Sequence, residues 1–425
     1  MIYVHIPFCK SFCTYCGFYS ETSGGYDRYI KALLKEIECR KQEIAGTMDV
    51  NTLYIGGGTP SVLPLPLLCR IVEAVKKASG TAGFEEFTVE LNPEDVARRG
   101  EAYAEALLGM GVTRASMGVQ SFDDGILCWM NRRHDGAAAV DAYQSLERAG
   151  FRSIGIDLIF GLPELRSGSL PESACGRRDD AAYVPLLTEM SWRETIRRAL
   201  DISATGVPPS HISAYQLSVE PDSALERMIA GGRCREASEE SCARQYEILC
   251  EELSAAGYNH YEISNFASPG HEARHNSAYW RHVPYVGFGP GAHSLEVLPD
   301  GGRRRSWNKP DLALYLDAYA PGSGRRRNFE ADLDALRGSE TLSREQIALE
   351  NVMLGLRTSA GCLLSELEEA CAPEALGKAI SDGHLVPVGG AEAACNPETP
   401  EPYYRIPEKY FFISDNIISG LMGIF

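Results

Sequence analysis

The chain has 425 residues, 44% of them hydrophobic, which is enough for one large domain and a smaller one. A net charge of -17 disfavours general binding to nucleic acid or to anionic lipid. No run of 18 apolar residues occurs, so a membrane-spanning helix is not expected. The thirteen cysteines do not resemble a secreted disulfide framework and no secretory signal is visible, so we expect a cytoplasmic protein.

The first two hundred residues alternate short β-rich segments with longer amphipathic ones, a pattern typical of parallel strands joined by crossover helices. Polar or Gly-rich residues follow the strands, which favours an α/β fold with a partial (β/α)6 barrel, similar to a TIM barrel, over a doubly wound sheet. Six strands are predicted at Ile2–Ile6, Thr52–Ile55, Glu86–Leu91, Arg114–Met117, Ser153–Ile159 and His211–Ser218. Five helices are predicted at Tyr26–Ile44, Pro64–Ala78, Pro93–Met110, Ala137–Ala149 and Trp192–Ala204.

The later part of the chain has a different character. Residues Leu165–Met190 are rich in Gly, Ser, Pro, Arg and Asp without a sustained period, which predicts a surface insertion. After roughly Glu340 the pattern becomes helical and compact, which predicts a smaller, mainly helical C-terminal domain. The predicted division is a core barrel at 1–220, a barrel extension at 221–335 and the C-terminal domain at 336–425.

Three cysteines directly after the first predicted strand are the most specific signal in the chain. Cys9, Cys13 and Cys16 form a C-x-x-x-C-x-x-C run. Three thiolates can hold three irons of a [4Fe–4S] cluster, which leaves one iron open to the amino and carboxylate groups of S-adenosylmethionine. A zinc site, which needs a fourth ligand such as His5, and three incidental thiols are the alternatives.

The segment that runs from Tyr3 through the cysteines to Gly17 resembles the start of radical S-adenosylmethionine enzymes of the coproporphyrinogen dehydrogenase-like superfamily. The turn Gly56-Gly57-Gly58-Thr59-Pro60 after the second strand resembles the glycine motif that contacts the methionine amino group in this superfamily. Taken alone, such a turn is also compatible with a simple strand-to-helix connection.

Polar residues after the next strands extend the resemblance. Glu90 resembles the ribose-binding acid of the superfamily, and a carboxylate suits hydroxyl donors. Gln120, Arg132 and Asp157 match further motifs, and Arg132 is expected to pair with the methionine carboxylate. Each of these residues, taken singly, could instead make an ordinary strand-end hydrogen bond, and Glu90 could favour a helix start.

The identity of one residue after the cysteines separates two groups of this superfamily. Coproporphyrinogen dehydrogenases of porphyrin biosynthesis carry a further cysteine where this chain has Phe18. The chain is similar instead to HemW-type heme chaperones, which are coproporphyrinogen oxidase-like, and so are its segments Tyr261–Ala267 and His275–Trp280. That resemblance implies that His275, Tyr279 and Trp280 bind heme, since heme iron accepts His or Tyr. The alternative for His275 is a hydrogen-bonded histidine beside core aromatics.

The resemblance therefore predicts a heme chaperone that binds a [4Fe–4S] cluster, S-adenosylmethionine and heme as cargo. It implies heme-acceptor proteins as partners, with membrane respiratory enzymes as the suggested acceptors, and it is compatible with a homodimer. The alternative functions are oxidative decarboxylation of coproporphyrinogen III, against which Phe18 argues, and another radical reaction on a tetrapyrrole. Whether the chain is an enzyme stays open at this point.

Overall fold

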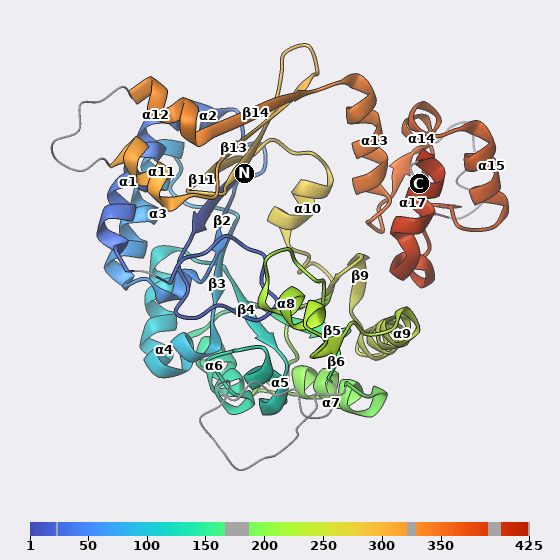
Figure 1. The fold of residues 1–425 in the computed structure, drawn as a ribbon, viewed down its shortest axis with the longest axis horizontal. Helices are drawn as coiled ribbons and strands as arrows, with labels where there is room; N and C mark the ends of the chain where they lie inside the picture. The colour runs from blue at the N-terminus through green and yellow to red at the C-terminus, as the bar shows by residue number, and fades with distance from the viewer. Residues whose placement is uncertain (23, 166–186, 321–328, 390–400, 424–425) are drawn as a thin grey trace.

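The computed structural model describes residues 1–425 except for 23, 166–186, 321–328, 390–400 and 424–425. Its central sheet contains β1 (Ile2–Ile6), β2 (Thr52–Gly57), β3 (Glu86–Leu91), β4 (Arg114–Gln120), β5 (Ser153–Phe160), β7 (His211–Gln216), β9 (Asn259–Glu262), β10 (Asn265–Ala267) and β11 (Val286–Phe288). The order is β11-β1-β2-β3-β4-β5-β7-β10-β9 (Figure 1). Strands β11 to β7 pair in parallel, whereas β10 is antiparallel to β7 and β9. The sheet is open, and the predicted α/β partial barrel is confirmed.

All six predicted strands are present, and they are consecutive neighbours in the sheet. Strands β1 and β3 have the predicted bounds. Strand β2 runs past its predicted end because Gly56 and Gly57 still pair with β1, opposite His5 and Ile6. The carboxyl ends of the parallel strands therefore lie at one edge of the sheet, where a barrel of this kind carries its site.

Helices cover the outside of the parallel strands (Figure 1). Helix α4 has the predicted bounds, whereas the predicted helix Tyr26–Ile44 is divided at Arg40. Arg40 is only 5% exposed, and its Nη1 donates to Glu36 and to the Gly287 carbonyl, both at 2.7 Å, so the chain turns where this side chain is drawn inward. The helices of this half are α1 (Tyr26–Cys39), α2 (Lys41–Ala45), α3 (Leu65–Ser79), α4 (Pro93–Met110), α5 (Asp124–Trp129), α6 (Gly136–Ala149) and α7 (Glu189–Leu200), with a 3-10 turn at Pro60–Val62.

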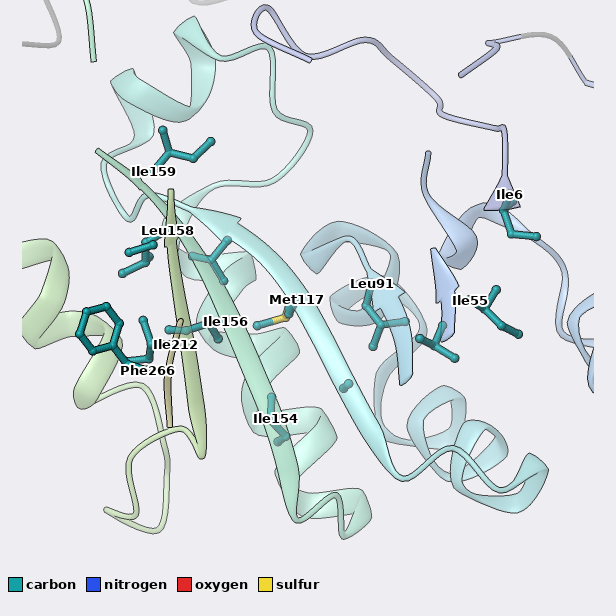
Figure 2. Close-up of a cluster of buried hydrophobic side chains, with 14 of the residues drawn as sticks. Ile6, Ile55, Leu91, Met117, Ile154, Ile156, Leu158, Ile159, Ile212 and Phe266 are labelled. Atoms are coloured by element: carbon teal, nitrogen blue, oxygen red, sulfur yellow. The ribbon is translucent and has the colours of Figure 1, made fainter. Parts of the chain in front are cut away.

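The two faces of the parallel sheet differ in chemistry because side chains alternate along a strand. The face toward the helices is apolar, and Figure 2 shows Ile55, Leu91, Met117 and Ile156 on four neighbouring strands. The inner face carries polar side chains at the alternate positions of the same strands, namely Tyr54, Glu90, Ser116, Asp157 and Ser213. A TIM barrel usually fills this space with bulky branched residues. This chain keeps a polar lumen instead.

The second half extends the main sheet and adds smaller ones. Strands β12 (His293–Val297), β13 (Arg303–Asn308) and β14 (Arg337–Leu342) form an antiparallel sheet. Short ladders join β6 (Glu164–Leu165) to β8 (Cys234–Arg235), and β15 (Cys362–Leu363) and β16 (Val386–Pro387) to β17 (Tyr403–Arg405). The helices of this half are α8 (Ala224–Ala230), α9 (Glu239–Ala255), α10 (Arg274–Trp280), α11 (Leu312–Tyr319), α12 (Phe329–Leu336), α13 (Arg344–Gly355), α14 (Leu364–Ala370), α15 (Pro373–Ser381) and α17 (Ser414–Met422), with a 3-10 segment at Glu408–Ile413.

The C-terminal part is mainly helical, as predicted, and α13, α14, α15 and α17 lie together at one side of the molecule (Figure 1). The proposed domain boundaries at 220 and 335 stay predictions. Most of the predicted insertion at Leu165–Met190 lies outside the described residues. Over the part of the chain that the structure describes, no helix combines the length and apolar character needed to cross a membrane.

Candidate functional site

A cavity of about 520 Å³ opens at the carboxyl ends of the parallel strands. Pockets for small molecules and cofactors usually have volumes of roughly 300–1,000 Å³. Most of the site residues predicted from the sequence share its wall, although they come from separate strand ends and loops. They are Cys9, Cys13, Cys16, Gly17, Gly57, Thr59, Glu90, Gln120, Arg132 and Asp157.

The cysteine loop is held to the barrel by main-chain hydrogen bonds. The Cys9 amide donates to Glu21 at 3.0 Å, and the Thr14 amide donates to Met130 at 3.2 Å. The Cys9 sulfur lies 3.3 Å from the Thr59 hydroxyl, and Arg132 Nη1 donates to the Cys13 sulfur at 3.4 Å. One hydroxyl and one guanidinium therefore stand against two of the three sulfurs.

Burial makes two of these thiols, Cys9 and Cys16, poor acids in the absence of a bound cation. Desolvation raises the pKa of Cys9, and it raises the pKa of Cys16 to about 11. A thiol binds metal only after it loses its proton, and a bound cation favours that loss. No set of three His, Cys, Asp or Glu side chains within the described ranges is grouped for a single metal ion. The three thiols instead share the wall of a larger space.

The glycine turn is fitted closely against the cysteine loop. The amides of Gly58 and Thr59 donate to the carbonyls of Ile6 and Phe8, both at 2.8 Å. A Cβ on Gly58 would stand 2.8 Å from the Phe8 carbonyl oxygen, so this approach requires glycine. Gly57 has a φ of 108°, the left-handed region that glycine tolerates. The turn thereby supports the loop that carries the cysteines.

Glu90 is the carboxylate nearest to this turn. Tyr54 donates its hydroxyl to Glu90 Oε1 at 2.7 Å, and the Gly57 amide donates to Oε2 at 3.0 Å. Burial raises the pKa of Glu90 to about 7, with the charge of Asp157 acting in the same direction and the two hydrogen bonds opposing it. Each carboxylate oxygen can accept more than one hydrogen bond. Glu90 therefore keeps acceptor capacity for a hydroxyl-bearing ligand.

Gln120, Arg132 and Asp157 complete this side of the cavity. Gln120 has a φ of 68°, an uncommon conformation for a side-chain-bearing residue that is often found at functional sites. Arg132 donates Nη2 to the Gly118 carbonyl, and its shielded Nε has no hydrogen-bond partner. Burial raises the pKa of Asp157 to about 6 against hydrogen bonds from Ser213 and Ser116. A buried cation and two carboxyls with raised pKa therefore face one space.

Two of the predicted residues, Tyr3 and Gly56, lie next to the cavity wall but do not line it. The Tyr3 hydroxyl lies 3.0 Å from His5 Nδ1, and His5 Nε2 lies 2.9 Å from the Tyr19 carbonyl. A Cβ on Gly56 would stand 2.6 Å from Glu90 Oε1, so a side chain at this position would collide with the Glu90 carboxylate.

A second cavity of about 500 Å³ adjoins the first, and Tyr215 and Asn276 belong to both walls. Predicted residues Tyr279 and Trp280 line it. Much of the remaining wall is aromatic or aliphatic, with Tyr285, Leu295, Leu354 and Ile263. Arg305 and Glu262 also reach it, and burial raises the pKa of Glu262 to about 7.

His275 does not face either cavity. It is 1% exposed, its Nδ1 lies 2.8 Å from the Thr52 hydroxyl, and its Nε2 lies 3.1 Å from the Tyr279 hydroxyl. Both ring nitrogens are therefore occupied, as in the alternative of a hydrogen-bonded histidine. An axial role would require one of these hydrogen bonds to break, and the heme role of His275 stays a prediction.

Several wall residues were not predicted from the sequence. Tyr54, Ser116 and Ser213 lie on the inner face of β2, β4 and β7, and Tyr215 and Asn276 separate the two cavities. The available signal was the polar residue at every second position of otherwise apolar strands. That pattern identifies a face, but it does not say that the face encloses a cavity.

Comparison with known proteins gives a consistent result. The radical SAM superfamily model matches residues 3–170. The chain is 32% identical over 375 residues to the "heme chaperone HemW" of Synechocystis sp., covering 86% of this chain and 79% of that protein. The proteins of the same description from Bacillus subtilis and Escherichia coli are 33% and 34% identical, covering 84% and 71% of this chain and 83% and 71% of their own. The solved structure of coproporphyrinogen III oxidase (HemN) from Escherichia coli, a radical SAM enzyme, superposes with a TM-score of 0.73 at 21% identity, covering 100% of this chain and 90% of that one, which supports the fold alone.

Proposed function

Because the chain belongs to the HemW family within the radical SAM superfamily, we propose that it binds a [4Fe–4S] cluster, S-adenosylmethionine and heme. We further propose that it passes heme to acceptor proteins, including membrane respiratory enzymes. The observation that carries the proposal is that one cavity wall unites three thiols with glycines, carboxylates and a buried arginine from five strand ends. A second, largely aromatic cavity shares part of that wall.

The residues of the first cavity fit the cluster and S-adenosylmethionine. Cys9, Cys13 and Cys16 would hold the cluster, whose positive irons offset the desolvation that now raises the pKa of Cys9 and Cys16. When bound, the cluster supplies an electron to the sulfonium of S-adenosylmethionine, chemistry that side chains cannot provide. The unpartnered Nε and the guanidinium charge of Arg132 suit the methionine carboxylate.

The polar residues around this position suit the rest of S-adenosylmethionine. Glu90 would accept from the ribose hydroxyls with the lone pairs that Tyr54 and Gly57 leave free. The main chain at Gly57 and Gly58 lies open to the methionine amino group, and Gln120 and Asp157 offer further polar contacts. Each of these roles is an assignment to a residue that lines the same space.

The second cavity fits a flat, largely apolar ligand with acidic arms. Tyr279 and Trp280 would contact the porphyrin face, since aromatic rings pack well against other rings. His275 would act as a positioning residue that holds the Tyr279 hydroxyl at 3.1 Å. The proposal includes a cytoplasmic location, since an oxygen-sensitive cluster requires a reducing environment. It also includes the domain boundaries at 220 and 335.

The cluster assignment is tested by anaerobic reconstitution of Cys13→Ser beside Cys39→Ser. Cys39 is an exposed cysteine on α1, away from the cavity wall, and serves as the matched control. Cys13→Ser should lose the brown cluster absorbance, and Cys39→Ser should keep it. Equal cluster content in the two variants would contradict the assignment.

The heme assignment is tested by titrating heme while following its absorption band in Trp280→Ala and in Tyr403→Ala. Tyr403 is an exposed aromatic residue outside both cavities. Trp280→Ala should bind heme about tenfold more weakly, the order expected for losing one large aromatic contact. If the reconstituted chain instead converts coproporphyrinogen III to a vinyl-bearing product, the chaperone-only interpretation is wrong.

A further inference from the structure

A third group of polar side chains lies in the lumen, toward the amino ends of the strands. Arg114, at the start of β4, is 4% exposed, and its side chain forms no ion pair or hydrogen bond with any described residue. It nevertheless belongs to the wall of the first cavity. Burying an unpaired charge is costly, so a guanidinium in this position calls for an anion.

Two further groups beside Arg114 lack partners. Thr88 pairs with Arg114 across the β3–β4 ladder, is 0% exposed, and its hydroxyl has no hydrogen-bond partner. His211 on β7 is 1% exposed, and its Nδ1 is likewise unpartnered. Such shielded and unsatisfied groups are rare in folded proteins, and two of them beside an arginine without an ion pair require an explanation.

The hydrogen-bond network indicates that His211 presents a donor. Its Nε2 lies 2.7 Å from the Tyr261 hydroxyl, which itself accepts from the Ala273 amide at 3.4 Å. The Tyr261 proton is therefore free to point at Nε2, which leaves the proton of the neutral ring on Nδ1. Burial and the nearby charge of Arg114 hold the pKa of His211 well below its ordinary value, which keeps the ring neutral.

Gly155 on β5 has no side chain, which lets two of these donors lie close over its main chain. A Cβ at Gly155 would stand 3.1 Å from Arg114 Nη2 and 3.4 Å from His211 Nδ1. The guanidinium of Arg114 and the imidazole of His211 therefore lie together over Gly155. Donors held side by side at the edge of a cavity favour an anionic acceptor over a water molecule, which would also need to donate.

We propose that Arg114, His211 and Thr88 form a carboxylate-binding site over Gly155. The site lies below the proposed position of S-adenosylmethionine, since Arg114 precedes Gly118 on β4 by a span of about 13 Å at the usual strand rise. Asp157, the next inward residue of β5, is close enough for Arg114 to lower its pKa but forms no ion pair with it. The occupant is a carboxylate that reaches the lumen through the first cavity.

The carboxylate chemistry is tested with sodium propionate, using sodium chloride at equal ionic strength as the reference. Propionate should raise the melting temperature of the wild-type chain in a saturable way, because a ligand that binds only the folded state stabilises it. Arg114→Gln should bind propionate about ten- to a hundredfold more weakly, as expected when a charged hydrogen bond is lost. Equal propionate responses in the two proteins, or none in the wild type, would overturn the proposal.

A second variant guards against misfolding of Arg114→Gln. Gly155→Ala keeps every donor but places a methyl group 3.1 Å from Arg114 Nη2 and 3.4 Å from His211 Nδ1, which displaces them, so it should also lose the propionate response. Gly109→Ala is the matched control, because a Cβ at Gly109 on α4 meets nothing within 4 Å. Retention of the propionate response in Gly155→Ala would show that these two donors do not hold the anion.

A porphyrin propionate is the carboxylate that the proposed function supplies, and this assignment rests on that function. Arg114→Gln should therefore weaken binding of heme but not of heme dimethyl ester. Binding of S-adenosylmethionine, whose carboxylate is assigned to Arg132, should be equal in Arg114→Gln and the wild type, and a selective loss of this binding would contradict the propionate assignment. Failure of the wild type to bind heme at all would contradict the proposed function while leaving the propionate result intact.

Discussion

The two faces of the parallel sheet obey different rules although the same strands build both. On β5, Ile156 is fully buried among apolar side chains toward the helices, whereas its neighbour Asp157 lines the cavity. The apolar face gains stability from burial and close packing. The lumen face instead holds carboxyls, an arginine and unpartnered donors, which cost stability until a ligand meets them. Because successive side chains of a strand point to opposite faces, the residues that stabilise the fold and the residues that line the cavity alternate along the same strand.

The largest expected effect comes from the apolar face. Ile156→Ala should lower the free energy of unfolding by about 2–5 kcal/mol, because it removes buried methyl groups and leaves a cavity. Chemical denaturation followed by circular dichroism measures this change. Ser116→Ala, on the lumen face of β4, is the comparison and should change stability by less than about 1 kcal/mol. Similar losses in the two variants would show that the lumen is packed like the core.

Strands were predicted correctly from the sequence where the alternation of apolar and polar residues is long enough to be recognised. Strands with several alternating positions, such as Glu86–Leu91, were predicted with their bounds. Strands β9, β10 and β11 were missed because three or four residues do not establish a period, and their pairing joins distant parts of the chain. The break at Arg40 was missed because its partners at Gly287 and Ser294 are brought close only by the fold.

The site was predictable where residues follow strand ends in order. The cysteine loop and Glu90 were recognised from position and spacing, and the structure places them on one wall. Arg114 was not predicted as a site residue, because an arginine at the start of a strand gives no sign of whether it faces solvent or a lumen. His275 shows the reverse case, since a histidine beside aromatics suggests a ligand until both of its nitrogens are found to be occupied.

An intermediate effect is expected for the pH dependence of the lumen face. Because burial raises the pKa of Glu90 from its ordinary value of 4.5 to about 7, the folded state holds this proton more tightly than the unfolded state. The resulting stability is fully present below pH 4.5 and is lost as pH rises through about 7. In the ligand-free chain, the free energy of unfolding should decrease with rising pH by about 1–2 kcal/mol less in Glu90→Gln than in the wild type.

The measurement is the free energy of unfolding of both proteins between pH 5 and pH 8.5. The glutamine can still accept from the Gly57 amide, so the variant retains one of the two hydrogen bonds that Glu90 makes. A wild-type stability that rises with pH relative to the variant would contradict the raised pKa. Glu38→Gln, on the exposed side of α1 next to Lys41, is the control and should leave the pH profile of the lumen unchanged.

The smallest effect is expected for a buried hydroxyl of the lumen face, whose contribution to stability should differ between the ligand-free and the propionate-bound chain. Thr88→Val replaces a buried hydroxyl that has no partner with a methyl group of similar size. In the ligand-free chain this change should be neutral or stabilising by up to about 1 kcal/mol, because an unsatisfied group is removed. In saturating propionate the advantage should disappear, since the hydroxyl then has an acceptor. Denaturation with and without propionate measures the difference, and a loss of stability in the free chain would show that the Thr88 hydroxyl already has a partner.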